Sequence, residues 1–167
     1  MALRVRLAEM SDLVAIRDFG RRVVVGFYES IGLHDYGEAV VTQYWESSAQ
    51  EDAIAEGRVI VAAEDDAIVG VTEFGWYEGE PIMWKLYVEP RMRGRGIGSK
   101  LVDGVIAAVA GMASSVLTEH AAENHEAARF YERIGFSVAW IEDGEGPGAT
   151  TIFRRKQLPT EATTSHY

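Results

Sequence analysis

The sequence of 167 residues contains no cysteine, so it offers no disulfide, no thiolate metal site and no cysteine nucleophile. Its four histidines show no metal-ligand spacing, and we expect no bound metal. We expect His120 to be a polar residue at a strand end rather than a base. The sequence also lacks the patterns of a signal peptide, a membrane span or a lipidation site, which predicts a cytoplasmic protein with no membrane partner.

Basic residues are scarce as well, with 16 Lys and Arg against 26 Asp and Glu and a net charge of −10. The exception lies between residues 85 and 100, where five basic residues oppose one acidic residue and leave a net +4. These residues are Lys85, Arg91, Arg93, Arg95 and Lys100 against Glu89. The rest of the chain, at −14, would repel a nucleic acid. A cationic segment in an acidic protein instead indicates a small polyanionic ligand.

A glycine-rich loop lies within this segment. An apolar strand runs into Pro90, a turn rich in arginine and glycine follows, and an apolar helix begins near Ile97. Gly94, Gly96 and Gly98 let the backbone pass close to a ligand and point successive N–H groups into one concavity. The start of the helix adds unpaired N–H groups and the positive end of its dipole. This arrangement predicts an anion site, most often a phosphate site.

Two other phosphate-binding loops fit the segment less well. A P-loop requires a Gly-Lys pair, but Lys100 follows Ser99. The dinucleotide fingerprint G-x-G-x-x-G matches Gly94 and Gly96, but Ser99 takes the third position. Glu119 lies roughly 20 residues beyond the loop, where a ribose-binding acid would fall. A dinucleotide-dependent oxidoreductase therefore remains an alternative.

A second motif spans residues 124–136, which read NHEAARFYERIGF. Asn124 is a good helix N-cap, and apolar side chains recur at the spacing of one helix face from Ala127 to Ile134. Packing alone accounts for most of these residues. It does not account for Tyr131, because a phenol on the buried side of a helix needs a hydrogen-bond partner.

Both motifs together resemble the GNAT superfamily of N-acetyltransferases. The first is R-x-x-G-x-G at Arg93, Gly96 and Gly98, and the second is N-x-x-A-x-x-F-Y-x-x-x-G-F from Asn124. They cover residues 86–136 and are separated by one predicted helix and one predicted strand. The resemblance implies an α/β (α+β) fold. Its central sheet is mixed and mostly antiparallel, the fourth and fifth strands splay apart, and helices cover both faces.

The remaining patterns are compatible with one domain over residues 1–158 and a flexible tail at residues 159–167. Hydrophobic periodicity predicts helices at about 11–26, 36–49, 52–56 and 97–111, and another from residue 124. Apolar, β-branched runs predict strands at about 3–7, 58–64, 67–76, 81–89, 115–119, 136–142 and 150–155.

The resemblance implies that acetyl-CoA binds where the fourth and fifth strands separate. The strand edge at Tyr87 and Val88 should pair with the pantetheine amides, Asn124 should bind the same arm, and Tyr131 should lie near the sulfur. Backbone amides of the loop should hold the pyrophosphate, from Arg93, Gly94, Arg95, Gly96, Ile97, Gly98 and Ser99. Candidates for the ribose phosphate are Arg91, Arg95 and Lys100.

The implied reaction is direct attack of a neutral primary amine on the thioester. The Val88 N–H could stabilise the tetrahedral intermediate, and Tyr131 could protonate the departing thiolate. Glu73 is the first candidate for the general base. It alternates along a strand with Val69 and Val71, and that apolar setting would raise the pKa of its carboxyl group.

Acidic and aromatic residues in the segments expected to hold the acceptor suit a small cationic amine or a peptide N-terminus. They are Asp35, Glu38, Glu73, Glu78, Glu80, Glu142, Asp143, Glu145, Phe27, Tyr28, Tyr36, Trp76, Tyr77 and Trp84. A solvated acidic surface over core aromatics is the alternative interpretation. A non-catalytic acyl-CoA sensor on the same fold is an alternative function, and the patterns leave open whether the chain forms a homodimer.

Overall fold

The computed structural model describes residues 2–159, and its strands form one seven-stranded sheet in the order β1-β2-β3-β4-β5-β7-β6. The strands are β1 (Leu3–Leu7), β2 (Val59–Glu64), β3 (Ala67–Tyr77), β4 (Glu80–Val88), β5 (Ser115–Ala121), β6 (Ser137–Glu142) and β7 (Thr151–Gln157). Every neighbouring pair is antiparallel except β4 and β5. The predicted mixed, mostly antiparallel sheet is confirmed.

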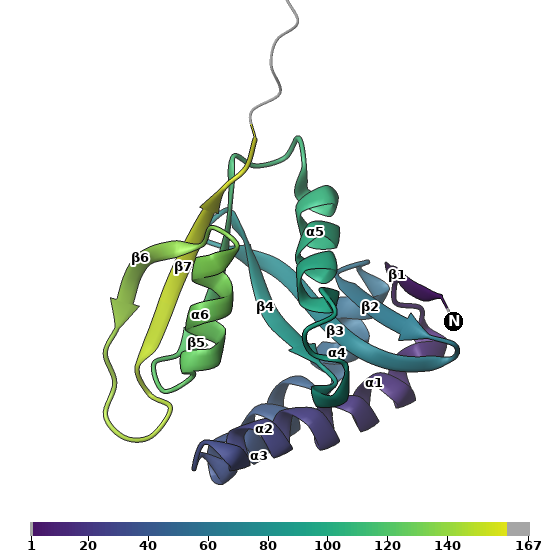
Figure 1. Ribbon diagram of the computed structural model, residues 1–167, viewed down its shortest axis with the longest axis horizontal. Coiled ribbons are helices and arrows are strands. Elements are labelled where there is room, and N and C mark those ends of the chain that lie inside the picture. Colours follow the sequence, from purple (N-terminus) through teal and green to yellow (C-terminus); the bar gives the residue numbers. More distant parts are fainter. Residues whose placement is uncertain (1, 160–167) are drawn as a thin grey trace, which may run out of the picture.

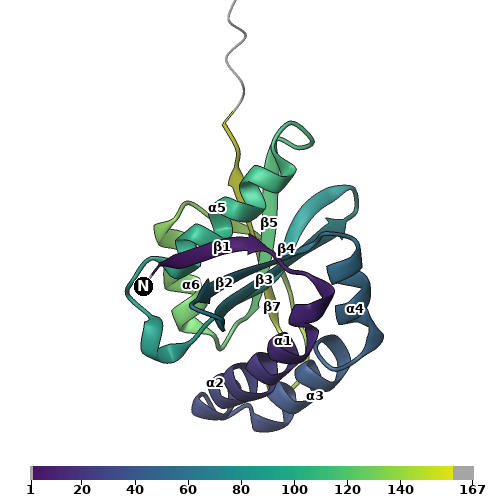
Figure 2. The same ribbon diagram turned by 90° about the vertical axis from the view of Figure 1, so that its right-hand side faces the viewer.

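Helices cover both faces of the sheet, as predicted (Figures 1 and 2). Alternate residues of β2 point to opposite sides: Val59 and Val61 pack against α1–α4, whereas Ile60 and Ala62 pack against α5 and α6. The helical elements are η1 (Met10–Asp12), α1 (Leu13–Phe19), η2 (Gly20–Val24), α2 (Val25–Ser30), α3 (His34–Tyr44), α4 (Ser48–Ala55), η3 (Pro90–Met92), α5 (Ile97–Val109) and α6 (His125–Arg133).

Strands β4 and β5 splay apart, as predicted, after a very short contact. They pair only where Ile82 meets Leu117 and Met83 meets Thr118, and they diverge beyond that point (Figure 1). The register between β3 and β4 shifts at the same level, which leaves Trp84 as an extra residue on β4. A bulge of this kind bends and twists its strand. The bulge therefore turns the second half of β4 away from β5.

The first helical stretch is longer than its sequence pattern indicates. It continues through Gly26 to Ser30, and the chain turns at Gly32, whose φ is +79°. Part of this stretch is a π-helical turn that begins at Gly20. A Cβ atom on Gly20 would collide with the ring of Trp45, so the absence of a side chain lets this helix pack against the indole. Packing, rather than the local pattern, sets the course of this helix.

The helix predicted at residues 36–49 is confirmed over residues 36–44, but it is interrupted before its predicted end. Helix α3 ends at Tyr44, and α4 begins at Ser48. The hydroxyl of Ser47 accepts a hydrogen bond from the Ala49 N–H at 3.3 Å and caps α4. A side chain that bonds to nearby backbone in this way competes with a continuous helix.

Within residues 2–159, no helix combines the length and the apolar character needed to cross a membrane. The tail predicted at residues 159–167 lies outside the described residues, apart from residue 159.

Candidate active site

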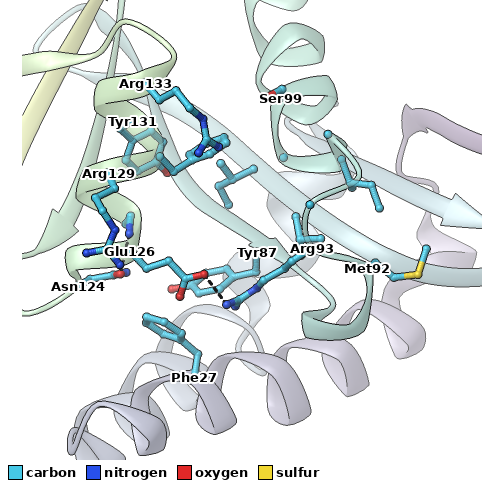
Figure 3. A pocket seen from close by; sticks show the side chains of 18 residues that line it. Phe27, Tyr87, Met92, Arg93, Ser99, Asn124, Glu126, Arg129, Tyr131 and Arg133 are labelled. Atoms are coloured by element: carbon cyan, nitrogen blue, oxygen red, sulfur yellow. Dashed lines mark hydrogen bonds and ion pairs between the residues drawn. The ribbon is translucent and has the colours of Figure 1, made fainter.

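A cavity of about 550 Å³ lies between the start of α5 and the length of α6, against β4 (Figure 3). It contains ten of the eleven residues predicted to bind the cofactor, and only Arg95 does not line it. The ten are Tyr87, Val88, Arg93, Gly94, Gly96, Ile97, Gly98, Ser99, Asn124 and Tyr131. The two sequence motifs thus form opposite walls of one cavity.

The glycines of the loop keep this cavity open. Gly94 and Gly96 have φ values of +79° and +75°, and no atom outside their immediate chain neighbours lies within 4 Å of where their Cβ atoms would be. Gly96 is the N-cap of α5 in the left-handed conformation. A Cβ on Gly98 would lie 3.2 Å from the ring of Phe130, so this glycine allows α5 and α6 to approach closely. The loop therefore presents bare backbone to the cavity.

Three arginines line this first cavity. Arg93 comes from the loop and pairs with Glu126 of α6 at 2.6 Å, across the cavity (Figure 3). Arg129 and Arg133 come from α6, and neither forms an ion pair with another residue in the 2–159 range. The Arg133 guanidinium lies 5.6 Å from the centre of the Phe130 ring. The cavity thus holds two cationic groups without a carboxylate partner among the described residues.

The cations expected for the ribose phosphate lie elsewhere. Arg91, Arg95 and Lys100 do not line the cavity. Instead, Arg91 is 83% exposed with its Nε 3.7 Å from Glu89, and the nearest contact of Arg95 to Glu64 is 3.9 Å. Arg129 and Arg133 were missed because they belong to a different motif, although their spacing places them one turn apart on one helix.

A second cavity, of about 660 Å³, lies on the α2–α4 side of the sheet. Five residues line both cavities: Leu86, Tyr87, Asn124, Ala127 and Tyr131. The two cavities therefore meet where β4 and β5 separate. Tyr131 lies at this junction with only 5% of its surface exposed, and burial raises the pKa of its phenol to about 12.

Glu119 of β5 lines the second cavity and not the first. Burial, with a smaller contribution from Glu142, raises the pKa of the Glu119 carboxyl to about 7. Its side chain has no hydrogen-bond or ion-pair partner within the described part of the chain. This position removes the support for a ribose-binding acid, because Glu119 is not in the cavity of the glycine loop. The spacing of Glu119 from the glycine loop along the chain therefore suggested the wrong cavity for this residue.

Glu73 also lines the second cavity, but its surroundings are not apolar. The Lys85 ammonium lies 3.0 Å from its carboxylate, and the Gln50 amide donates to the same oxygen at 3.4 Å. Lys85 and Gln50 therefore make this setting polar, and a bulge at Val69 removes one of the two valines expected on this face. Val71 packs with the α1–α4 cluster, but Val69 packs with the α5 cluster. Glu73 is thus one member of a cross-strand ion pair.

Lys85 is the buried partner in this pair, with 6% of its surface exposed. It donates to the Tyr44 carbonyl at 2.6 Å and to Gln50 at 2.9 Å, and it lies 4.5 Å from the centre of the Trp45 ring. Burial lowers the pKa of its ammonium group. Lys85 therefore belongs to the wall of the second cavity, and not to the cationic loop that follows it in the sequence.

Most of the residues predicted for the acceptor do not line the second cavity. Those that do are Glu73, Tyr28, Tyr36 and Trp84, and the structure adds Asp52 of α4 and Glu56, the C-cap of that helix. The residues outside it are Asp35, Glu38, Glu78, Glu80, Glu142, Asp143, Glu145, Phe27, Trp76 and Tyr77. Several have other partners: Glu38 pairs with Arg21, Glu80 pairs with Arg155, and Phe27 lines the first cavity.

The loop between β6 and β7 closes against the second cavity. Gly148 has a φ of +76°, and its missing side chain leaves room for the ring of Tyr36. The Gly148 N–H also donates to the Glu123 carboxylate at 2.7 Å. The loop is thereby held to α3 and to the start of α6. Within residues 2–159, no group of three or more His, Asp or Glu side chains is arranged to hold a metal ion.

Comparison with known proteins gives a family and a fold. The model of the acetyltransferase (GNAT) domain matches residues 55–138, which is half of the chain. The PaiA N-acetyltransferase from Thermoplasma acidophilum, solved in complex with coenzyme A, is 19% identical and has a TM-score of 0.77 over 95% of this chain and 100% of its own.

Two further solved structures have the same fold. Ard1 from Thermoplasma volcanium is 19% identical, with a TM-score of 0.74 over 96% of this chain and 100% of its own. The ribosomal-protein-S18-alanine N-acetyltransferase from Escherichia coli is 16% identical, with a TM-score of 0.70 over 99% of this chain and 100% of its own. No curated protein matches the sequence. At these identities, the solved structures establish the fold alone.

We predict that Gly96→Asp abolishes acetyl-CoA binding. The added carboxylate would project into the open space above the loop and repel the pyrophosphate. Isothermal titration calorimetry with acetyl-CoA measures the effect. Gly79→Asp is the matched control, because Gly79 has a φ of +83° with equally open surroundings but lies outside the first cavity. Equal affinity in Gly96→Asp and the wild type would contradict the assignment of the loop.

Proposed function

The chain belongs to the GNAT family of acetyltransferases, and on this premise we propose that it acetylates the primary amine of a small cationic molecule. It is an acyltransferase with acetyl-CoA as its acyl donor. The main support for the proposed reaction is the meeting of two chemically different cavities at Tyr131. One cavity suits a polyanionic thioester, and the other suits an amine.

Acetyl-CoA would lie in the first cavity, with its pyrophosphate on the backbone amides of residues 93–99 and the positive end of α5. Its pantetheine amides would pair with β4 at Tyr87 and Val88, where the splay leaves backbone groups without a strand partner. The Asn124 side-chain oxygen accepts from the Ala127 N–H at 3.0 Å and caps α6. Its amide NH₂ is then the group that would donate to a pantetheine carbonyl.

We infer that Arg129 and Arg133 bind the 3′-phosphate of CoA. Both line the first cavity, and neither has a carboxylate partner among the described residues. A phosphate that bridges them would neutralise charge that α6 otherwise presents to water, and each guanidinium can donate two parallel hydrogen bonds. These arginines would take the role that the sequence assigned to Arg91, Arg95 and Lys100.

The reaction would begin at Glu119. The carboxylate accepts a proton from the ammonium group of the acceptor, directly or through water, and the neutral nitrogen attacks the thioester carbon. The Val88 N–H would donate to the oxyanion of the tetrahedral intermediate. The C–S bond then breaks, the electron pair leaves with sulfur, and Tyr131 donates its hydroxyl proton to the thiolate. One of the two protons on the attacking nitrogen passes through water to the Tyr131 oxygen, which leaves a neutral amide, and Glu119 releases its proton to solvent. With a pKa of about 12, Tyr131 stays protonated at neutral pH and available as a donor.

We infer Glu119 as the base instead of Glu73. A base must have a free lone pair and a pKa near the working pH. The Glu119 carboxyl has a pKa of about 7 and no partner within the described part of the chain. Glu73 holds Lys85 at 3.0 Å, and loss of its charge would leave a buried ammonium unpaired. Glu73 then supports the cavity wall instead of exchanging protons with the substrate.

The charges and the enclosure of the second cavity favour a small cationic acceptor. Both of its basic residues have carboxylate partners, since Lys85 pairs with Glu73 and Arg58 pairs with Glu56 at 2.7 Å. Glu119 is therefore left to attract a cation, together with the exposed Asp52. The loop held on Tyr36 narrows the approach, which favours a small molecule over a folded protein.

A panel of amines tests this function, with release of CoA as the measurement. We predict turnover with polyamines, aminoglycosides or amino-acid amides, and a KM for the amine that rises with ionic strength as salt screens the attraction. Peptides with free N-termini and amines that carry a carboxylate complete the panel. A preference for an anionic acceptor would contradict the proposed substrate class. Acetyl-CoA binding without CoA release from any amine would favour the sensor.

We predict that kcat/KM rises with pH through about 7, because Glu119 must be deprotonated to accept the proton. Glu119→Gln should remove this dependence and lower kcat/KM by about 10²- to 10⁴-fold. The control is Glu132→Gln, which changes an exposed carboxylate outside both cavities. A pH profile that keeps its acid limb in Glu119→Gln would assign the base elsewhere.

Folding stability gives a check on Glu119 that needs no substrate. The pKa of its carboxyl is raised in the folded protein from 4.5 to about 7, so the folded state binds the proton more tightly. This contribution to stability is fully present below pH 4.5 and is lost as the pH rises to about 7. Glu119→Gln should therefore flatten the fall in melting temperature across this window.

We predict that the double variant Arg129→Gln/Arg133→Gln raises the KM for acetyl-CoA by roughly tenfold or more, since a charged hydrogen bond contributes about 1.5–3 kcal/mol. The KM for 3′-dephospho-acetyl-CoA should change little. Arg91→Gln/Arg95→Gln is the matched control, because it removes the same charge outside the cavity. Equal effects of the two double variants would show that only the net charge matters.

A further inference from the structure

His120 of β5 lies buried between an arginine and Tyr131. The Arg154 Nε donates to the His120 Nε2 at 3.0 Å, and the His120 Nδ1 lies 2.9 Å from the Ala121 carbonyl oxygen. A guanidinium can only donate, so Nε2 must be the unprotonated nitrogen. Nδ1 then carries the hydrogen and donates it to the carbonyl. Both nitrogens are committed, and the imidazole is held neutral in one tautomer.

This arrangement excludes His120 as the general base, although it lines the second cavity. Its one lone pair is occupied by Arg154, and a second proton on the ring would face the guanidinium. Burial, together with the Arg154 charge, lowers the pKa of the imidazole. His120 and Arg154 are each only 7% exposed, so the pair is shielded from water. The His120 imidazole is therefore a rigid, uncharged ring.

The His120 ring faces the ring of Tyr131. The two ring centres are 6.1 Å apart, with 19° between the ring planes. Phe136 meets the Tyr131 ring edge-on at 5.5 Å, and Phe130 does so at 5.4 Å. Arg154 also donates to the Phe136 backbone carbonyl at 3.2 Å, so it holds the ring of His120 and the backbone of Phe136. One arginine thus ties β7 to the surroundings of Tyr131.

We propose that His120, locked by Arg154, is a positioning residue that fixes the Tyr131 ring so that its hydroxyl meets the thioester sulfur. The inference rests on the proposed role of Tyr131 as proton donor. A histidine suits this place because it supplies two things at once: a flat face for the phenol and an in-plane acceptor for the buried arginine. A phenylalanine supplies only the face, and a glutamine supplies only the acceptor.

Two variants separate these contributions. His120→Gln should keep the melting temperature within a few degrees, because its amide oxygen can accept from Arg154, but it should lower kcat about tenfold at an unchanged KM for acetyl-CoA. His120→Phe keeps the flat face but removes the acceptor for Arg154, so it should lower kcat less than His120→Gln does and should lower the melting temperature. His125→Gln, at an exposed histidine outside both cavities, is the control. An unchanged kcat in His120→Gln would overturn the proposal.

A double-mutant cycle with Tyr131→Phe tests whether His120 acts through the phenol. In the Tyr131→Phe background, His120→Gln should change kcat by less than about twofold. A tenfold loss in both backgrounds would overturn the positioning role and indicate a general structural one. If Tyr131→Phe alone leaves kcat unchanged, the proposed role of Tyr131 fails, and the positioning inference fails with it for that separate reason.

A spectroscopic test covers the case in which the variants fold poorly. In wild-type protein labelled with ¹⁵N-histidine, His120 should give the shifts of a neutral ring protonated at Nδ1, and these should persist below pH 6. His125 serves as the internal reference. A His120 ring that titrates near pH 6.5, or that carries its proton on Nε2, would overturn the lock by Arg154.

Discussion

The rest of the structure depends on the loss of hydrogen bonding between β4 and β5. The two strands pair at only two positions, and the extra residue Trp84 bends β4 away just beyond them. Backbone N–H and C=O groups on the free edge of β4 need partners, and burying them without partners would be costly. A ligand with amides along its length can supply those partners. The same opening connects the two faces of the sheet, so one interruption creates both a binding edge and a passage.

The two sides of this passage have different chemistry because different helices cover them. On the α5 and α6 side, the groups are bare glycine backbone and arginines, which suit an anion. On the α2–α4 side, they are mainly tyrosines and carboxylates. Tyr131 stands between the two sides, and burial keeps its phenol protonated. Burial also raises the pKa of the Glu119 carboxyl to about 7, whereas a solvated carboxyl group on the same strand would keep a pKa near its ordinary value.

Charged groups within the wall of the second cavity are fixed by pairing. Lys85 contacts Glu73, Gln50 and the Tyr44 carbonyl, so all three of its N–H donors are used. Removal of one member of such a buried pair costs about 3–5 kcal/mol, because the other charge stays buried without compensation. Arg154 is likewise a buried cation held by a hydrogen bond, and its acceptor is the neutral imidazole of His120. Glu119 lines the same cavity without a hydrogen-bond or ion-pair partner among residues 2–159, which is why we propose it as the base.

The sequence by itself determined the features that depend on a few neighbouring residues. The left-handed glycines of the loop, the Asn124 cap and the position of Tyr131 on its helix are local, and all three lie where the motifs predicted. Only the tertiary structure decided which charges face the cavities, because that depends on strand faces and register. A bulge moves later residues to the other face. One bulge, at Val69, therefore separated Val69 from Val71, and packing brought Arg129, Glu119 and the Arg154–His120 pair to the site.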